Sequence, residues 1–195
     1  MRGGEEFLTE NDLIKKCKKG SREAFNILFS RYQTQVVNIA YSMLSDREDA
    51  YDAAQETFVR VYRNIESFKE QSSFTTWLYR ITTNVCSDML RKRQRDTNVI
   101  SINQFADENK DFDIKDDSPT VEENMELSER QAAVRSAINE LKEEYRAVIT
   151  LCDIEGMSYD EISKVLDIPS GTVKSRINRA RNALKKILIK KRELF

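Results

Sequence analysis

Apolar residues recur at steps of three and four along most of this 195-residue chain, which is the period of an amphipathic α-helix. Only five glycines and two prolines interrupt the pattern. A β-sandwich or β-barrel needs many tight turns, so this scarcity of turn residues argues against both. The sequence therefore predicts an all-α protein made of small helical domains.

Four helices are predicted in the N-terminal half. The first three start at residues of the N-cap type, which are Thr9, Ser21 and Asp46. A polar stretch over 67–73 predicts a loop, and a fourth apolar stripe follows over 74–93. Because the apolar faces of four helices can pack around one core, residues 1–95 are expected to form a four-helix domain.

An acidic segment follows the first domain. Residues 98–127 contain nine acidic and two basic side chains, a balance of −7. The helical period fails over 96–119, which predicts a flexible acidic linker. Thr120 and Glu123 have the spacing of a capping box and are expected to open a second domain of four helices, over 120–195.

The second domain carries the pattern of a helix-turn-helix over 158–184. A capping box of Ser158 and Glu161 opens a short helix, a turn follows, and a longer helix ends the motif. An earlier helix of this domain is expected to turn Val134 toward the core. The longer helix carries polar and basic side chains of the types that bond base edges and phosphates in DNA. They are Lys174, Ser175, Arg176, Asn178, Arg179, Arg181 and Asn182.

Charge separates this domain from the linker. Residues 164–192 contain ten basic residues and one acidic residue, a balance of +9. A charged helix face is often only a solvated surface. Two capping signals and the reversal of charge after the linker favour DNA binding instead.

The end of the fourth predicted helix forms a second basic cluster, with Arg91, Lys92, Arg93 and Arg95. Aromatic residues near it could stack single-stranded bases. Phe74 and Trp77 also fall on the apolar stripe, so a role in the core is the alternative for both. The position of Phe68 in the loop leaves its role open.

The first half of the third helix is acidic, from Asp46 to Glu56. An acidic surface repels DNA, so this face is expected to meet a protein. Ordinary placement of acids beside the helix N-terminus is the alternative.

Residue types exclude several functions. The chain has no histidine, which removes the commonest general base and metal ligand. Three cysteines stand far apart without a CxxC pair, so no zinc site or disulfide framework is expected. No apolar segment approaches the roughly 18 residues of a membrane span. We expect a cytoplasmic protein with no cofactor and no small-molecule substrate.

Three segments in order carry specific motifs: EDAYDAAQETF over 48–58, FTTWLYRITTN over 74–84, and SYDEI with GTVKSR over 158–162 and 171–176. Together they resemble the small extracytoplasmic-function (ECF) class of the sigma-70 family of RNA polymerase sigma factors. The resemblance spans nearly the whole chain. It implies a transcription initiation factor that binds core RNA polymerase and reads promoter DNA, and that is not an enzyme.

The resemblance also implies roles for particular residues. Binding to the clamp helices of the largest polymerase subunit would fall to Asp52, Gln55, Glu56 and Phe58. Reading of the melted −10 element would fall to Phe68, Ser72, Arg80, Asn84, Arg91 and Arg93. Reading of the −35 duplex would fall to Thr172, Lys174, Ser175, Arg176, Asn178 and Arg179.

Further partners follow from the same resemblance. The second domain would also contact a flap-like site on polymerase, the acidic linker would thread through the enzyme, and an anti-sigma factor, commonly membrane-bound, would regulate the chain. Ala53 and Ala54 depart from the larger aliphatic residues common in the family's polymerase-binding helix. The alternative is a stand-alone dimeric helix-turn-helix regulator. A nucleic-acid enzyme is not expected, because it would need a carboxylate cluster for a metal ion or an acid–base pair.

Overall fold

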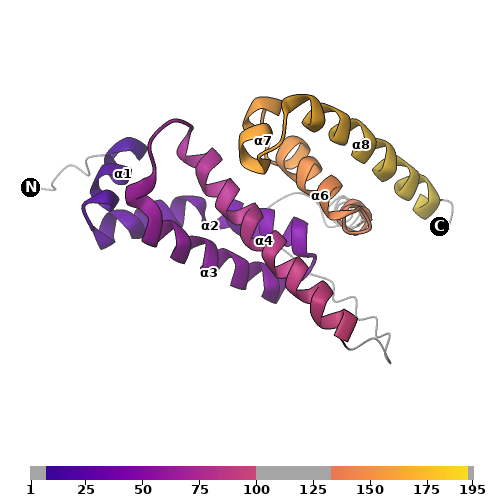
Figure 1. The fold of residues 1–195 in the computed structure, drawn as a ribbon, viewed down its shortest axis with the longest axis horizontal. Coiled ribbons are helices and arrows are strands. Elements are labelled where there is room, and N and C mark those ends of the chain that lie inside the picture. The colour runs from indigo at the N-terminus through magenta and orange to yellow at the C-terminus, as the bar shows by residue number, and fades with distance from the viewer. Residues whose placement is uncertain (1–7, 100–132, 193–195) are drawn as a thin grey trace, which may run out of the picture.

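The computed structural model describes residues 8–99 and 133–192 (Figure 1). Every regular element in these ranges is helical, which confirms the predicted fold class. The first group contains α1 Glu10–Lys18, α2 Arg22–Leu44, α3 Arg47–Asn64, the 3₁₀ turn η1 Ile65–Ser67 and α4 Phe74–Val99. The second group contains a helical segment over 133–139, α6 Glu143–Ile149, the π-helical turn η2 Thr150–Ile154, α7 Tyr159–Leu166 and α8 Ser170–Arg192.

Side-chain caps begin the first three helices, as predicted. The Thr9 side chain accepts from the Asp12 amide, Ser21 from Ala24, and Asp46 from Asp49, at 3.3, 3.2 and 2.9 Å. Each bond satisfies an amide that has no partner within its helix, an effect of about 1 kcal/mol per cap. Local sequence therefore fixes where these helices start.

The fourth helix is longer than predicted, because α4 ends at Val99 rather than near Arg93. Its last turns thus occupy the first residues of the expected linker. Asp96, Thr97 and Asn98 each disfavour a helix by only roughly 0.5–0.7 kcal/mol relative to alanine. That cost is too small to end a helix that is already nucleated. The rest of the expected linker and the Thr120–Glu123 capping box lie outside the described residues.

Each group of helices encloses apolar side chains. In the first group, Val36, Ile39 and Leu78 have no exposed surface, and Leu28 and Val61 have almost none. In the second group the fully buried side chains include Val148, Leu151, Ile162 and Val173. Val134 was expected to join them, but it is 41% exposed. Val134 lies one turn before the buried Ala137, and the described residues around it leave its side chain partly exposed to solvent.

The turn η2 was not predicted from the sequence. Its amide-to-carbonyl bond joins Glu155 to Thr150 at 2.9 Å, five residues apart, and Gly156 follows with φ +68°. Such a widened turn re-aims the side chains that follow it and often occurs at functional sites. Here it brings the Glu155 carboxylate to the hydroxyl of Tyr79 on α4, 3.2 Å away.

The predicted capping box of the helix-turn-helix is present at the start of α7. The Ser158 hydroxyl accepts from the Glu161 amide, and the Glu161 carboxylate accepts from the Ser158 amide at 2.9 Å. Asp167 ends the helix in the left-handed conformation, with φ +54°. α8 begins after a turn through Pro169. The motif therefore has the short helix, turn and long helix that the sequence predicted.

Replacing Ser158 by alanine is expected to lower the free energy of unfolding of the second group by about 1 kcal/mol, because the Glu161 amide loses its acceptor and the Glu161 carboxylate loses the Ser158 hydroxyl. Thermal unfolding followed by circular dichroism measures the loss. Ser30 is exposed on α2, away from any helix end, so Ser30→Ala is the control and should change little. Equal stability of the Ser158→Ala variant and the original protein would contradict the capping role.

The two groups lie side by side, with α4 packed against α7 and α2 against α6 (Figure 1). α8 lies on the outer side of the second group in this view. None of the described helices is both long and apolar enough to cross a membrane. The fold thus places one long helix, α4, at the junction of the two groups.

Candidate nucleic-acid interface

The exposed face of α3 is acidic and polar. Asp52, Gln55 and Glu56 all lie on it, as the sequence indicated. Phe58 does not, because its ring is only 6% exposed and lies 4.2 Å, centroid to centroid, from Phe29. Phe58 therefore supports the binding face from within the core and is not itself part of the exposed surface.

Sequence reasoning missed three exposed apolar side chains on α3. Tyr51 and Val59 are each 41% exposed, and Tyr62 is 48% exposed. Together with Gln55 they follow helical spacing along one face of the helix. The helical period predicts Phe58 and Tyr62 on the inner face of this helix; Phe58 is buried there, but Tyr62 is exposed. Aromatic and aliphatic surface beside a few polar groups is typical of protein-binding faces.

The loop before α4 hides its aromatic residue. Phe68 is 4% exposed and packs against Phe74 and Trp77, with ring centroids 5.7 and 5.3 Å away. The ammonium of Lys18 lies 5.4 Å from the centre of the Phe68 ring. Phe74 is also buried, in agreement with the core alternative. The Phe68 ring is thus not available to stack on a base in this conformation, whereas Ser72 is partly exposed.

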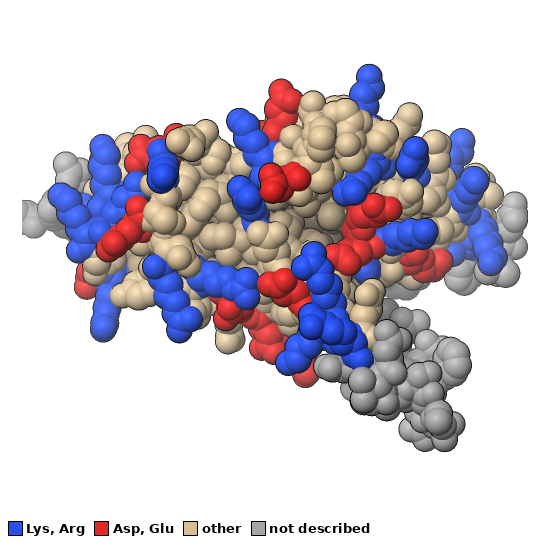
Figure 2. Space-filling model, viewed as in Figure 1, with Lys and Arg blue, Asp and Glu red and all other residues tan. Residues whose placement is uncertain are grey.

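The side of α4 away from the core carries the predicted basic and polar groups. Arg80, Asn84, Arg91 and Arg93 are all exposed. Figure 2 shows basic side chains gathered over the end of α4 and along α8. Arg93 pairs with Asp49 of α3 at 3.2 Å. Four groups with the chemistry for phosphate or base contacts therefore line one helix.

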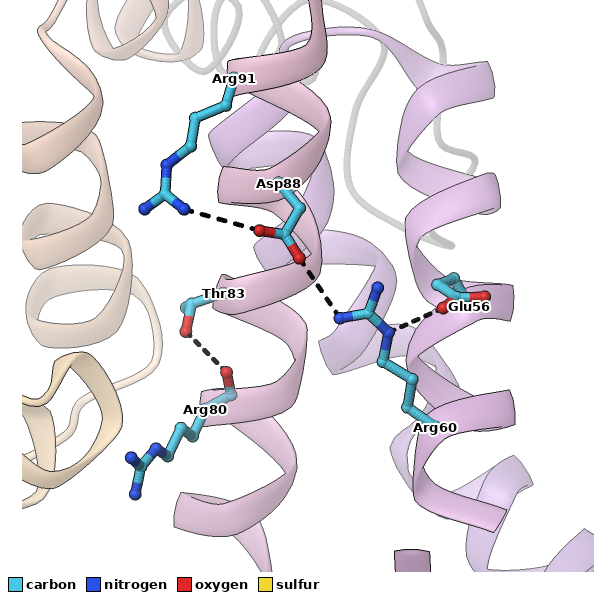
Figure 3. Close-up of polar contacts among 6 residues, drawn as sticks. All are labelled: Glu56, Arg60, Arg80, Thr83, Asp88 and Arg91. Carbon is cyan, nitrogen blue, oxygen red and sulfur yellow. Dashed lines mark hydrogen bonds and ion pairs between the residues drawn. The ribbon is translucent and has the colours of Figure 1, made fainter. Parts of the chain in front are cut away.

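A chain of opposite charges joins α3 to α4 (Figure 3). Arg60 pairs with Glu56 at 2.7 Å and with Asp88 at 3.4 Å. The other carboxylate oxygen of Asp88 lies 3.6 Å from Arg91. The hydrogen bond that Arg60 donates to Glu56, together with the one it donates to Asp88, raises the pKa of Arg60. The acidic face of α3 and the basic end of α4 are thus electrostatically connected.

α8 turns its predicted residues outward. Lys174, Ser175, Asn178 and Arg179 are exposed, and Thr172 is partly exposed. Arg176 is less accessible, because its side chain is 30% exposed and pairs with Glu144 of α6 at 3.4 Å. Val173 and Ile177, on the opposite side of the helix, are buried. α8 therefore presents one polar face and one core face, as a recognition helix does.

The structure brings two of these surfaces together. A cavity of ≈ 780 Å³ lies between α4 and the second group of helices. Asn84 and Arg91 line one side of it, and Glu144 and Arg176 line the other. Arg80 also reaches across, to Asp167 at 3.7 Å. Arg60 of α3 also lines this cavity, whereas Ser72 and the acidic Asp52 and Glu56 do not.

Burial shifts the pKa of groups at the junction. Desolvation raises the pKa of Glu155, and the bond from Tyr79 partly offsets this effect. Burial, then the charge of Glu155, raises the pKa of Tyr79. Burial also raises the pKa of the Cys86 thiol to about 12, so this cysteine is unreactive while covered. Among the described residues, no group of three His, Cys, Asp or Glu side chains could hold a metal ion.

Comparison with known protein families gives two matches. Residues 28–96 match Sigma-70 region 2, and residues 131–184 match Sigma-70, region 4. The first match covers α3 and α4, and the second covers the helix-turn-helix. Each of the two helix groups therefore has its own counterpart in the family.

Whole proteins are similar over almost the full length. The chain is 38% identical to the ECF RNA polymerase sigma-E factor of Haemophilus influenzae, over 92% of this chain and 95% of that protein. It is 37% identical to the RNA polymerase sigma-H factor of Pseudomonas aeruginosa, over 92% of this chain and 93% of that protein. The Escherichia coli K12 sigma-E factor is 38% identical, with 92% and 94% covered.

Two solved structures share the fold. CnrH, in complex with the cytosolic domain of CnrY, has a TM-score of 0.63 and 26% identity, with 90% of this chain and 94% of that chain covered. RpoE of Bartonella quintana, in complex with the anti-sigma factor NepR, has a TM-score of 0.68 and 26% identity, with 84% and 96% covered. Motifs, helix-turn-helix, family matches and full-length relatives agree: this chain belongs to the ECF class of sigma-70 family RNA polymerase sigma factors, the non-enzymatic initiation factors that direct RNA polymerase to promoters through regions 2 and 4.

Proposed function

We propose that three separate helix faces divide the work of promoter recognition. α3 binds core polymerase, α4 with the preceding loop reads the melted −10 element, and α8 reads the −35 duplex. One observation carries this assignment: the first half of α3 exposes the acidic Glu48, Asp52 and Glu56, whereas most exposed charges of α4 and α8 are basic. In this scheme region 2 comprises residues 1–95, an acidic linker spans 96–119, and region 4 comprises 120–195.

The face of α3 fits a protein rather than DNA. Its Asp52 and Glu56 carboxylates would repel phosphates, and Gln55 can bond a protein backbone or side chain. Tyr51, Val59 and Tyr62 add exposed apolar area beside these polar groups. The clamp helices of the largest polymerase subunit are the partner we assign to this face. A smaller groove of ≈ 380 Å³ beside Leu184 and Leu188 of α8 would contact the flap-like site.

The outer side of α4 fits a melted strand. Arg80, Arg91 and Arg93 would hold phosphates, and the Asn84 amide would bond the edge of an unstacked base. Ser72 adds a hydroxyl in the loop. Phe68 holds this loop against the core, so it acts as a support unless the loop rearranges on binding. Capture of an unstacked base offsets an unstacking cost of a few kcal/mol, which favours the melted state without ATP.

The polar face of α8 fits the major groove of duplex DNA. Lys174, Ser175, Arg176, Asn178 and Arg179 would reach base edges or phosphates, with Thr172 near the start of the helix. Two modest contacts joined by a linker bind tightly only when their spacing suits, so promoter spacing should matter.

Regulation by a partner protein completes the proposal. The solved structure of the Bartonella quintana relative contains an anti-sigma factor. We assign this chain an anti-sigma partner as well, held at a membrane, with the sigma factor itself acting in the cytoplasm where polymerase works. No cofactor enters the scheme, since both recognition steps use only side chains of this chain.

Replacing Asn84 by alanine tests the −10 assignment. The variant is expected to bind core polymerase normally but to open its promoter about tenfold less well, because one base-edge contact of about 1–3 kcal/mol is lost. Permanganate footprinting of the melted strand measures opening, and a pull-down measures core binding. Asn26 is exposed on α2 and belongs to none of the assigned binding faces, so Asn26→Ala is the control. Equal losses in both assays, or none in either, would reject this role for Asn84.

A further inference from the structure

The loop before α4, residues 68–73, is anchored at both of its ends. At the start, the Phe68 ring is only 4% exposed, because it packs on aromatic rings of α4. At the end, the Ser73 hydroxyl accepts from the Thr76 amide at 3.1 Å and caps the helix. The four residues between these anchors, 69–72, are exposed or partly exposed. Neither anchor by itself fixes the path that these four residues take.

One ion pair holds the middle of the loop. The Lys18 ammonium lies 3.3 Å from the Glu70 carboxylate and 5.4 Å from the centre of the Phe68 ring. In the part of the chain that the structure describes, this pair is the one side-chain hydrogen bond or ion pair that residues 69–72 make. Lys18 belongs to α1 and is 52 residues away from Glu70 in the sequence. The path of the loop thus depends on a helix that is distant along the chain.

Glu70 has a backbone conformation that glutamate rarely adopts. Its φ of +58° lies in the left-handed region, where a side chain crowds the backbone and glycine is the usual residue. Among the described residues, Ser45 and Asp167 share this conformation, but each of them ends a helix and bonds its last turn. Strain of this kind persists where the surroundings compensate it, often at functional sites. At Glu70 the compensating contact is the pair with Lys18.

α1 holds the Lys18 ammonium at a defined place. The apolar side of α1 is buried in the core of region 2, and the helix packs on α2 and on η1, just before the loop. The Tyr32 hydroxyl of α2 donates to Glu10 of α1 and lies 3.4 Å from the Thr75 hydroxyl of α4, just after the loop. The Lys18 side chain is only 26% exposed, so its stem is packed as well. α1 is therefore fixed relative to both ends of the loop.

We propose that Lys18 is a positioning residue for recognition of the −10 element: its ammonium holds Glu70 in the left-handed conformation and so sets where Ser72 meets an unstacked base. The inference rests on the proposed −10 role of the loop and α4. Groups that select a ligand must be held within about 0.5 Å of their productive position. Without the pair, residues 69–72 can take several paths, and a wrong base is accommodated more easily. Lys18 itself touches no DNA in this scheme.

The test measures base preference with the full chain in the holoenzyme. A promoter that the holoenzyme transcribes is randomised at each −10 and −35 position in turn, and the transcripts are counted by sequencing. Lys18→Ala is expected to lower the preference for the best base over the worst at least about threefold in part of the −10 element, with the −35 preference unchanged. Lys18→Arg keeps the charge and the contact with the ring, so it should retain the preference. Lys16→Ala removes the same charge from an exposed position in the same turn of α1 and is the control.

Glu70→Gly separates positioning from stability. Glycine relieves the strain at φ +58° but removes the carboxylate. Its thermal stability should therefore match or exceed that of the original protein, while its −10 preference should fall as in Lys18→Ala. A merely structural role would lower both quantities together. The charge exchange of Lys18→Glu with Glu70→Lys should recover much of the preference that either single change loses, because it restores the ion pair.

Unchanged −10 preference in folded Lys18→Ala and Glu70→Gly would overturn the positioning role, and so would an equal loss in Lys16→Ala. Asn84→Ala distinguishes this failure from failure of the −10 assignment, because Asn84 is exposed on α4 outside the loop. If Asn84→Ala lost −10 preference while the Lys18 and Glu70 variants kept it, the positioning role alone would be wrong. If all three kept it, the −10 assignment would be wrong as well.

Discussion

An Arg176→Ala variant is expected to lose recognition of the −35 element while binding core polymerase as tightly as the original protein. Arg176 lies on the polar side of α8, and its guanidinium can make two parallel bonds to a guanine edge. Loss of such a contact costs about 1–3 kcal/mol, or about 5- to 150-fold in affinity. Holoenzyme binding to a promoter with an intact or scrambled −35 element measures the effect.

The control for Arg176 separates base reading from general charge. Lys186 is exposed on the same helix beyond the helix-turn-helix, so Lys186→Ala removes one positive charge without touching the predicted reading positions. It should weaken binding to intact and scrambled elements alike and reduce the salt dependence. Loss of core binding by Arg176→Ala, or retained preference for the intact element, would show that α8 does not have the assigned role.

A Leu78→Ala variant is expected to lose about 2–5 kcal/mol of the free energy of unfolding of region 2. Leu78 has no exposed surface and lies where α2, α3 and α4 meet, so its removal leaves a cavity among three helices. Small domains have a total stability of roughly 5–15 kcal/mol, so much of it would be gone. Urea unfolding followed by the fluorescence of Trp77, the single tryptophan of the chain, reports on this region.

The matched change for Leu78 is Lys92→Ala, on the exposed side of the same helix. It should alter stability by less than about 0.5 kcal/mol, as surface substitutions generally do. If Leu78→Ala cost less than about 1 kcal/mol, the packing described for α4 would be incorrect. Core binding by the variant should fall as well, because the face of α3 depends on the same core.

Local signals in the sequence predicted much of the fold. Thr9, Ser21, Asp46 and Ser158 were identified as caps and act as caps, because the bonds they make depend only on residues two or three positions away. The helix-turn-helix was predicted from a capping box, a turn and the helical spacing of apolar residues, all of which are local signals. The outward positions on α4 and α8 followed from the same helical period.

Features that depend on distant segments were not predicted. Phe68 and Phe58 were placed among the binding residues from motifs, but their rings pack on Trp77 and Phe29. The exposed Tyr51, Val59 and Tyr62 have the composition of core residues, so only the folded structure distinguishes them. Tyr79 of α4 is buried where Glu155 of the second group meets it, and such packing between distant segments leaves no period in the sequence.

Run-off transcription tests the central claim most directly. Purified protein is added to core polymerase lacking any sigma factor, with sheared DNA from the same source as template, and the transcript starts are sequenced. We expect defined starts only when both proteins are present, each preceded by two shared elements at fixed spacing. An absence of new starts, together with tight binding of DNA by the protein alone, would contradict the account and favour a regulator that acts without polymerase.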